Sequence, residues 1–185
     1  MTYINTSEDV PSDLNAAIAL AYSPSGYTCT NLQKEPESED YGAFTFEMNS
    51  LQIKFRIAKI TPTKVGQFVT LWKRIGEGGI LPHDLMDPID LFVVSVRNDE
   101  HFGQFVFPKA VLAEKGILSK DGKGGKRAMR IYPPWDITDS QQARNTQTWQ
   151  LKYFLEIPEE DIDLSRLKKL FYYTPKKDVT AELVE

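Results

Sequence analysis

The run DLFVVSVR, residues 90–97, constrains the fold of this chain more than any other stretch. Apolar side chains occupy both faces of an extended backbone here, so neither face of the strand has the polar side chains expected of a solvent-exposed face. A strand of this kind lies inside a sheet, because both of its faces have to be covered. The sequence therefore predicts a sheet in which residues 90–97 form a central strand.

Two segments further upstream, 43–48 and 51–57, predict a hairpin with a tight turn at Asn49 and Ser50. In LQIKFRI, the second segment, apolar residues alternate with polar ones. Period two places Lys54 and Arg56 on one face of the strand, opposite the apolar face. We expect both cations on the wet face of the sheet.

The remaining elements follow from the same kinds of pattern, and together they predict a single domain over residues 1–185. Helices are expected over 11–22, 108–116, 139–147 and 163–173, the last with Asp163 as its cap. Further strands are expected over 66–74, 102–107, 127–132 and 149–157. Residues 1–35 supply a helix and an acidic loop, and 176–185 a frayed tail. The fold class is α+β, with a mixed, mostly antiparallel sheet of about seven strands and peripheral helices.

Composition narrows the classes of protein. With 185 residues and a single cysteine, Cys29, the chain can form neither an intramolecular disulfide nor a cysteine cluster for zinc. Its first residues lack the basic and apolar regions of a secretory leader, and no apolar run has the length of a bilayer span. We expect a cytoplasmic monomer with no membrane partner and no cofactor.

Charge is distributed unevenly along the chain, whose formal net charge is −4. A first basic segment, residues 48–76, holds six basic residues and no acid, and a second, residues 120–130, holds five basic residues and one acid. The rest of the chain is strongly acidic. A local basic footprint of this kind is typical of nucleic-acid binding, although strands that carry lysine and arginine on a wet face would give the same count.

Metal and nucleotide motifs are poorly represented. His83 and His101 lie in separate loops, outside any HExxH or CxxC pattern. His83 could form a loose ligand set with Asp84 and Asp87, but a polar loop explains these three better, and we expect no metal site. GKGGKR, residues 122–127, lacks the spacing of a phosphate-binding P-loop and precedes a strand.

RIYPPWD, residues 130–136, permits two interpretations. Asp136 with Gln150 and Lys152 approximates the carboxylate and lysine set of a magnesium-dependent nuclease, with glutamine where a carboxylate is usual. Asp136 could equally cap the helix that follows. Likewise Trp135 could stack on unpaired bases or plug the core at a corner, and the second interpretation is favoured.

Four stretches of the chain resemble the MepB-like family of small bacterial proteins, whose best-known member is encoded beside a multidrug efflux pump. They are FRIAKITPTKVGQFVTLWKR (55–74), FGQFVFPKAVL (102–112), GKRAMRIYPPWD (125–136) and QTWQLKYF (147–154). The family has no established enzymatic activity. The resemblance implies a nucleic-acid-binding protein whose fold is similar to DNA-binding pseudobarrels. The family's motif residues fall here on Arg56, Lys59, Thr61, Lys64, Gln67, Trp72, Lys73, Arg74, Lys126, Arg127, Arg130 and Trp135.

We therefore expect a non-enzymatic protein that binds DNA, single strands included, with little sequence preference. A magnesium-dependent or degenerate nuclease and a protein–protein adaptor are the alternatives. No helix pairs with another as in a helix-turn-helix motif, so phosphate contacts and base stacking would provide the affinity. The predicted binding residues are Lys54, Arg56, Lys59, Thr61, Lys64, Gln67, Lys73, Arg74, Lys126, Arg127, Arg130, Tyr132 and Trp135.

Overall fold

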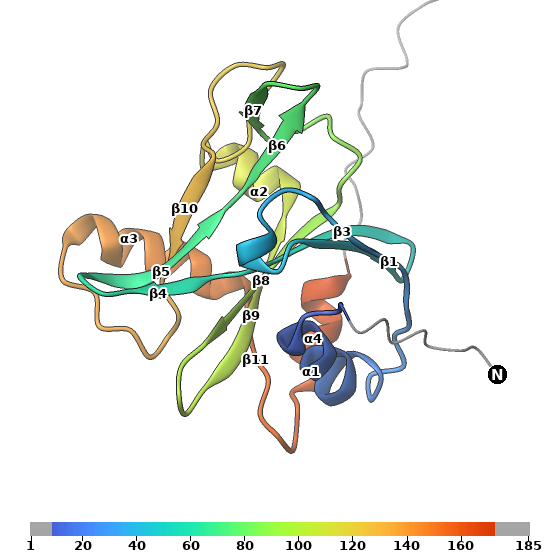
Figure 1. Cartoon of the computed structure of the whole chain (residues 1–185). Coiled ribbons are helices and arrows are strands. Elements are labelled where there is room, and N and C mark those ends of the chain that lie inside the picture. Colours follow the sequence, from blue (N-terminus) through green and yellow to red (C-terminus); the bar gives the residue numbers. More distant parts are fainter. Residues whose placement is uncertain (1–8, 173–185) are drawn as a thin grey trace, which may run out of the picture.

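A six-stranded sheet forms the centre of the computed structural model, which describes residues 9–172 (Figure 1). Its strands lie in the order β1-β2-β3-β8-β9-β11, and all neighbours are antiparallel except β3 and β8. Their bounds are β1 Cys29–Lys34, β2 Phe44–Met48, β3 Leu51–Ile57, β8 Leu91–Arg97, β9 Phe102–Pro108 and β11 Phe154–Glu156. The predicted α+β class and the mostly antiparallel sheet are confirmed.

Strand β8 is central, as its apolar run predicts. Every residue from Leu91 to Val96 is buried, and successive side chains enter different cores. Leu91 and Val93 belong to a core that also contains residues of α1 (Ser12–Ala17) and α4 (Leu164–Phe171). Phe92 and Val94 belong to a second core with α2 (Lys109–Glu114). Both faces of the sheet are therefore covered.

Two smaller sheets lie within or beside the long connection from β3 to β8. One has the order β10-β5-β4, built from β4 Lys59–Thr61, β5 Lys64–Thr70 and β10 Ala128–Ile131. The other is the hairpin of β6 (Trp72–Ile75) and β7 (Gly79–Pro82). The strand expected over 66–74 is divided at Leu71 into β5 and β6, and the N–H of Leu71 donates to the carbonyl of Arg127 at the end of the β5–β10 ladder. The sequence patterns missed β1, β4 and β7.

Asn49 and Ser50 form the predicted turn between β2 and β3, and both have positive φ, 52° and 61°. Two central residues in this left-handed region are typical of the type I′ turn that joins twisted strands. The turn fixes the register in which Thr45 pairs with Lys54. The side chain of Lys54 is thereby placed on the same face of the sheet as that of Thr45.

The strand predicted over 149–157 is wrong in its first half. Helix α3 spans Gln141–Gln150, and η3, a 3₁₀ turn at Leu151–Tyr153, precedes β11. In a strand, Trp149 and Tyr153 would lie on the same face of the sheet. Because they are four positions apart, they also lie on one side of a helical backbone. Both rings pack against Phe107. The spacing satisfies both periods, and the helical one is realised.

The other helices agree with the sequence patterns. The N-terminal helix consists of α1 and a π-helical turn η1, Ile18–Tyr22, and a short η2 covers Glu39–Tyr41. Asp163 caps α4, since its carboxylate accepts from the N–H of Arg166. The expected frayed tail lies outside the described residues. Within residues 9–172, no helix combines the length and apolar character that crossing a membrane requires.

Candidate nucleic-acid interface

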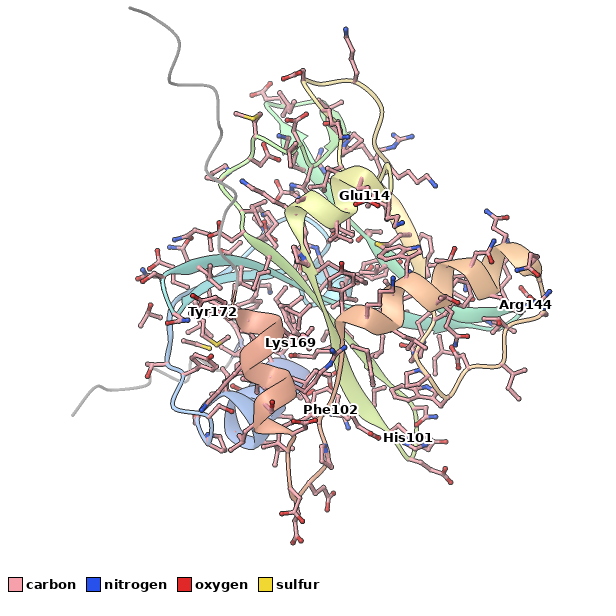
Figure 2. The ribbon with its side chains drawn as sticks, turned by 180° about the vertical axis from the view of Figure 1, so that it is seen from behind. His101, Phe102, Glu114, Arg144, Lys169 and Tyr172 are labelled. Carbon is pink, nitrogen blue, oxygen red and sulfur yellow. The ribbon has the colours of Figure 1, made fainter. Side chains whose placement is uncertain are left out.

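Antiparallel pairing of β5 with β10 brings the two basic segments together. Arg130 stands opposite Phe68 in this ladder, and Ala128 opposite Thr70. Since β5 belongs to the first basic segment and β10 to the second, cations that are far apart in the sequence share one small sheet. Figure 1 shows α3 lying beside β10 and β5, and Figure 2 shows it reaching outward from the body of the molecule to Arg144.

A groove of about 700 Å³ lies between this sheet and α3. Val65 and Met129 contribute to its sheet side, and Ala143 and Thr146 to its helix side. We call it the α3 groove. It is lined by Thr63, Lys64, Val65, Phe68, Lys115, Ile117, Lys126, Ala128, Met129, Arg130, Tyr132, Asp139, Ser140, Gln142, Ala143, Thr146, Trp149 and Gln150.

Positive charge predominates in the α3 groove. Four cations line it, Lys64, Lys115, Lys126 and Arg130, against one acid, Asp139. Among residues 9–172, neither of the exposed lysines 64 and 126 takes part in an ion pair. Their ammonium groups are thus available to an external anion.

Arg130 is held at the floor of the groove. Its Nη1 donates to the hydroxyl of Thr61 and to the carbonyls of Val65 and Gly66, at 3.0–3.3 Å. All three bonds use this one nitrogen, and the guanidinium carbon lies 5.9 Å from the ring centre of Phe68. The guanidinium is therefore oriented by the protein before any ligand arrives, which reduces the entropy lost on binding.

Three half-buried aromatic residues, Phe68, Tyr132 and Trp149, also line the groove. The Tyr132 ring packs over Gly66, where an added Cβ would lie 2.7 Å from the ring. Gln150 is buried, accepts from the N–H of Tyr132 and donates to the carbonyl of Arg130, so its amide joins α3 to β10. Aromatic faces beside cations are the usual combination in proteins that bind single strands.

Trp135 lies outside the lining of the groove and occupies the corner that the sequence favours. Its ring stacks on His101 at 5.0 Å and meets Phe154 edge to face. Asp136 beside it is partly buried, and this burial raises the pKa of its carboxyl, against the effect of the Gly66 N–H. Helix α3 is capped by Ser140, which accepts from the N–H of Ala143, so Asp136 is not the cap.

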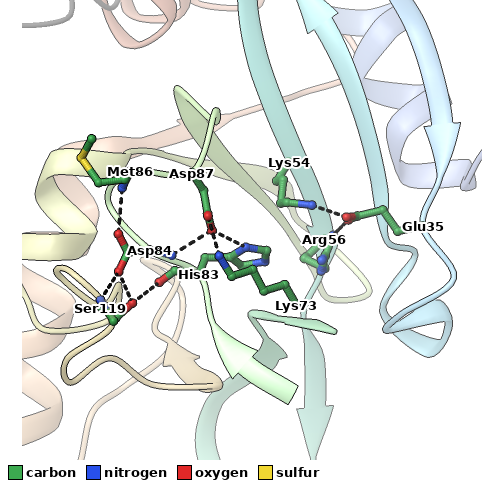
Figure 3. Close-up of polar contacts among 10 residues, drawn as sticks. Glu35, Lys54, Arg56, Lys73, His83, Asp84, Met86, Asp87 and Ser119 are labelled. Atoms are coloured by element: carbon green, nitrogen blue, oxygen red, sulfur yellow. Dashed lines mark hydrogen bonds and ion pairs between the residues drawn. The ribbon is translucent and has the colours of Figure 1, made fainter. Parts of the chain in front are cut away.

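The expectation that Lys54 and Arg56 lie on a wet face is wrong for Arg56. Its side chain is 1% exposed and pairs with Glu35, which Lys54 also contacts (Figure 3). Gln67, another predicted residue, is buried and donates to the carbonyl of Arg97. These residues stand within the protein and not at its surface.

The other predicted residues occupy separate places. Exposed Lys59 lies over the ring of Tyr41, and exposed Arg74 lies near the ring of Trp72. Arg127 is exposed at the edge of β10, and Lys73 forms an ion pair with Asp87. The structure thus brings Lys64, Lys126, Arg130 and Tyr132 to one groove and leaves the remainder outside its lining.

His83 was expected in a polar loop but is buried, 1% exposed, against Phe92. Burial, with Lys54 and Arg56 nearby, lowers the pKa of its imidazole to about 4. The carboxylate of Asp84 forms no ion pair with His83 and instead accepts hydrogen bonds from Ser119 and from backbone N–H groups (Figure 3). No group of three potential metal ligands forms within the described part of the chain.

We call six of these side chains the buried charge cluster: Glu35, Lys54, Arg56, Lys73, His83 and Asp87. Burial opposes ionisation of Glu35, but Arg56 and Lys54 hold the pKa of its carboxyl below the ordinary value. Asp87 behaves alike, since burial is overcome by Lys73 and by the N–H of Asp84. Both carboxyls are therefore charged at neutral pH.

A family model described as MepB-like matches residues 35–156, which include both basic segments, the α3 groove and the buried charge cluster. A crystal structure of MepB is 34% identical, with a TM-score of 0.70, and the match covers 80% of this chain and 98% of that one. The structure of the bacterial homing endonuclease I-Ssp6803I is 15% identical, with a TM-score of 0.43 and coverage of 80% and 92%. No curated protein matches the chain.

Proposed function

The chain belongs to the MepB-like family, and from that premise we propose that it binds DNA without acting on it chemically. The α3 groove is the proposed binding site. Phosphates would lie against Lys64, Lys126 and Arg130, and unpaired bases against Trp149 and Tyr132. Little sequence preference is expected, since none of these contacts reads a base edge.

The observation that carries this proposal is the pair of exposed lysines, 64 and 126, that share a groove with aromatic rings and form no ion pair among residues 9–172. A chain of net charge −4 repels phosphate on average. A local excess of cations in a concave site offsets this repulsion, because the walls of the groove concentrate their field.

Fluorescence anisotropy with labelled single- and double-stranded oligonucleotides tests the proposal. If all four cations of the groove neutralise phosphates, the logarithm of affinity falls against the logarithm of salt concentration with a slope of about −3 for single strands. We expect the single strand to bind more tightly, since only unpaired bases expose faces for stacking.

Charge reversal at Lys64→Glu with Lys126→Glu is expected to remove binding. The matched control is Lys168→Glu with Lys169→Glu on α4, which makes the same change in net charge at two exposed positions outside the groove. Equal loss in both double variants would assign the effect to net charge and refute the groove. Arg56 is unsuitable for this test, because Arg56→Glu would bury a carboxylate beside Glu35.

A further inference from the structure

A second cavity, of about 350 Å³, lies over the face of β2 and β3 and shares no lining residue with the α3 groove. Thr45 and Lys54 contribute from paired positions of the two strands, and Lys73 from β6. His83 and Asp87 close it from the segment that follows β7. Three separate parts of the chain thus converge on one small space.

His83 lines this cavity, yet neither of its ring nitrogens has a hydrogen-bond partner among residues 9–172. Nδ1 lies 3.4 Å from Oδ2 of Asp87 without hydrogen-bond geometry. The adjacent Arg56 is equally buried, and its Nε and Nη2 are unpartnered too. Buried polar groups are nearly always paired in proteins, so these nitrogens indicate a partner that the polypeptide does not supply.

The charge of the cluster identifies the kind of partner. Lys54, Arg56 and Lys73 face the two carboxylates of Glu35 and Asp87, which leaves one positive charge in excess while His83 is neutral. The ammonium groups of Lys54 and Lys73 each have three hydrogens, and the ion pair to Glu35 or Asp87 uses one of them. The remaining donors, with the hydroxyl of Thr45, surround the cavity.

We propose that this cavity binds a phosphate group, through Lys54, Lys73, Thr45 and His83. A phosphate accepts several hydrogen bonds at once, which matches donors that approach from three strands and a loop. Lysine serves such a group well because its ammonium acts as a compact point charge. The phosphate could be free or nucleotide-borne, or it could be the end of a nucleic-acid strand, and the site is independent of the α3 groove.

Thermal unfolding in sodium phosphate, compared with sodium chloride of equal ionic strength, tests whether free phosphate binds in the cavity. At a phosphate concentration ten times the dissociation constant, the unfolding midpoint should rise by about 3 °C. Lys73→Met removes one donor and should abolish the rise. Lys64→Met, a matched change in the α3 groove, should leave it intact.

Anisotropy with 5′-phosphorylated and 5′-hydroxyl oligonucleotides of one sequence tests whether the end of a nucleic-acid strand binds in the cavity. Tighter binding of the phosphorylated strand, lost in Lys73→Met and retained in Lys64→Met, would identify a strand end as the ligand. Thr45→Val tests the same site without touching an ion pair, should Lys73→Met fail to fold. The proposal is overturned if neither free phosphate nor the 5′-phosphate of an oligonucleotide has a larger effect than its control. It is also overturned if the effect persists in both Lys73→Met and Thr45→Val.

Discussion

The α3 groove and the buried charge cluster use the same cationic residue types in opposite ways. In the groove, Lys64 and Lys126 are exposed and form no ion pair within the described residues. In the cluster, Arg56 and Lys54 share the carboxylate of Glu35. Arg56 is thus committed to the fold by a buried ion pair, whereas Lys64 and Lys126 are available to a ligand.

The largest effect is expected where a committed charge loses its partner. Glu35→Gln leaves Arg56 buried without a counter-charge, and we expect the free energy of unfolding to fall by about 3–5 kcal/mol. Urea unfolding measures this change. Glu39→Gln is the control, since Glu39 pairs with Lys34 in solvent and its loss should change little. Equal effects of the two substitutions would show that the cluster does not stabilise the fold.

Acid should weaken the cluster through His83. Its folded pKa of about 4 lies below the ordinary 6.5, so in this window the unfolded chain binds a proton that the folded chain lacks. Stability is fully present above pH 6.5 and falls as the pH decreases to 4, by about 3 kcal/mol in total. Glu35, whose pKa is also lowered in the folded chain, should reduce the free energy of unfolding further as the pH falls below 4.5. Unfolding curves between pH 4 and 7 measure the slope.

His83→Gln should flatten the profile between pH 4 and 6.5, because the group whose pKa the fold lowers is then absent. A profile that keeps its slope in His83→Gln would contradict the burial of a neutral imidazole.

Stacking in the groove should have an intermediate effect. Trp149→Leu keeps an apolar side chain against Phe107 but removes the flat face, and binding of a single strand should weaken by about 1–3 kcal/mol for each base stacked there. Trp135→Leu should leave affinity unchanged, since this ring packs on His101 and Phe154. The reverse order of effects would move the stacking platform to the corner that RIYPPWD forms.

The smallest effect on stability is expected from the uncommitted cations. Lys64→Met with Lys126→Met should alter the free energy of unfolding by no more than about 0.5 kcal/mol, because both side chains are exposed. The salt slope of single-strand binding should decrease in magnitude by about 1.4, as two phosphate contacts are lost. A destabilised double variant with an unchanged slope would place both lysines among the committed charges.

Local patterns predicted the elements better than they predicted the environment of the cations. The apolar run 91–96 and the turn at Asn49 and Ser50 gave the central strand and the hairpin, because both depend on neighbouring residues. Period two separated Arg56 from the apolar face correctly. It could not show that Glu35, 21 positions earlier, pairs with it beneath the surface.

The α3 groove was predicted in part, since Lys64, Lys126, Arg130 and Tyr132 line it. Lys115 and Trp149 were missed. The spacing of Ala143, Thr146, Trp149 and Gln150 is helical and would have placed Trp149 beside the cations, but the alternation after it favoured a strand. Whether a charge is buried depends on pairings between distant segments, and no window of sequence contains these.

The parallel pairing of β3 with β8 has a kinetic consequence. Residues 58–90 form the crossover between these strands, and they contain β4, β5, β6 and β7. They therefore supply one wall of the groove and Lys73, one of the two lysines of the phosphate cavity. Long-range pairing of this kind closes slowly, on a scale of about milliseconds to seconds. We expect amide hydrogens of the β6–β7 hairpin to exchange sooner than those of β8, because the hairpin opens without disturbing either core. The phosphate cavity, which takes Lys73 from this hairpin, would then open while the six-stranded sheet remains folded.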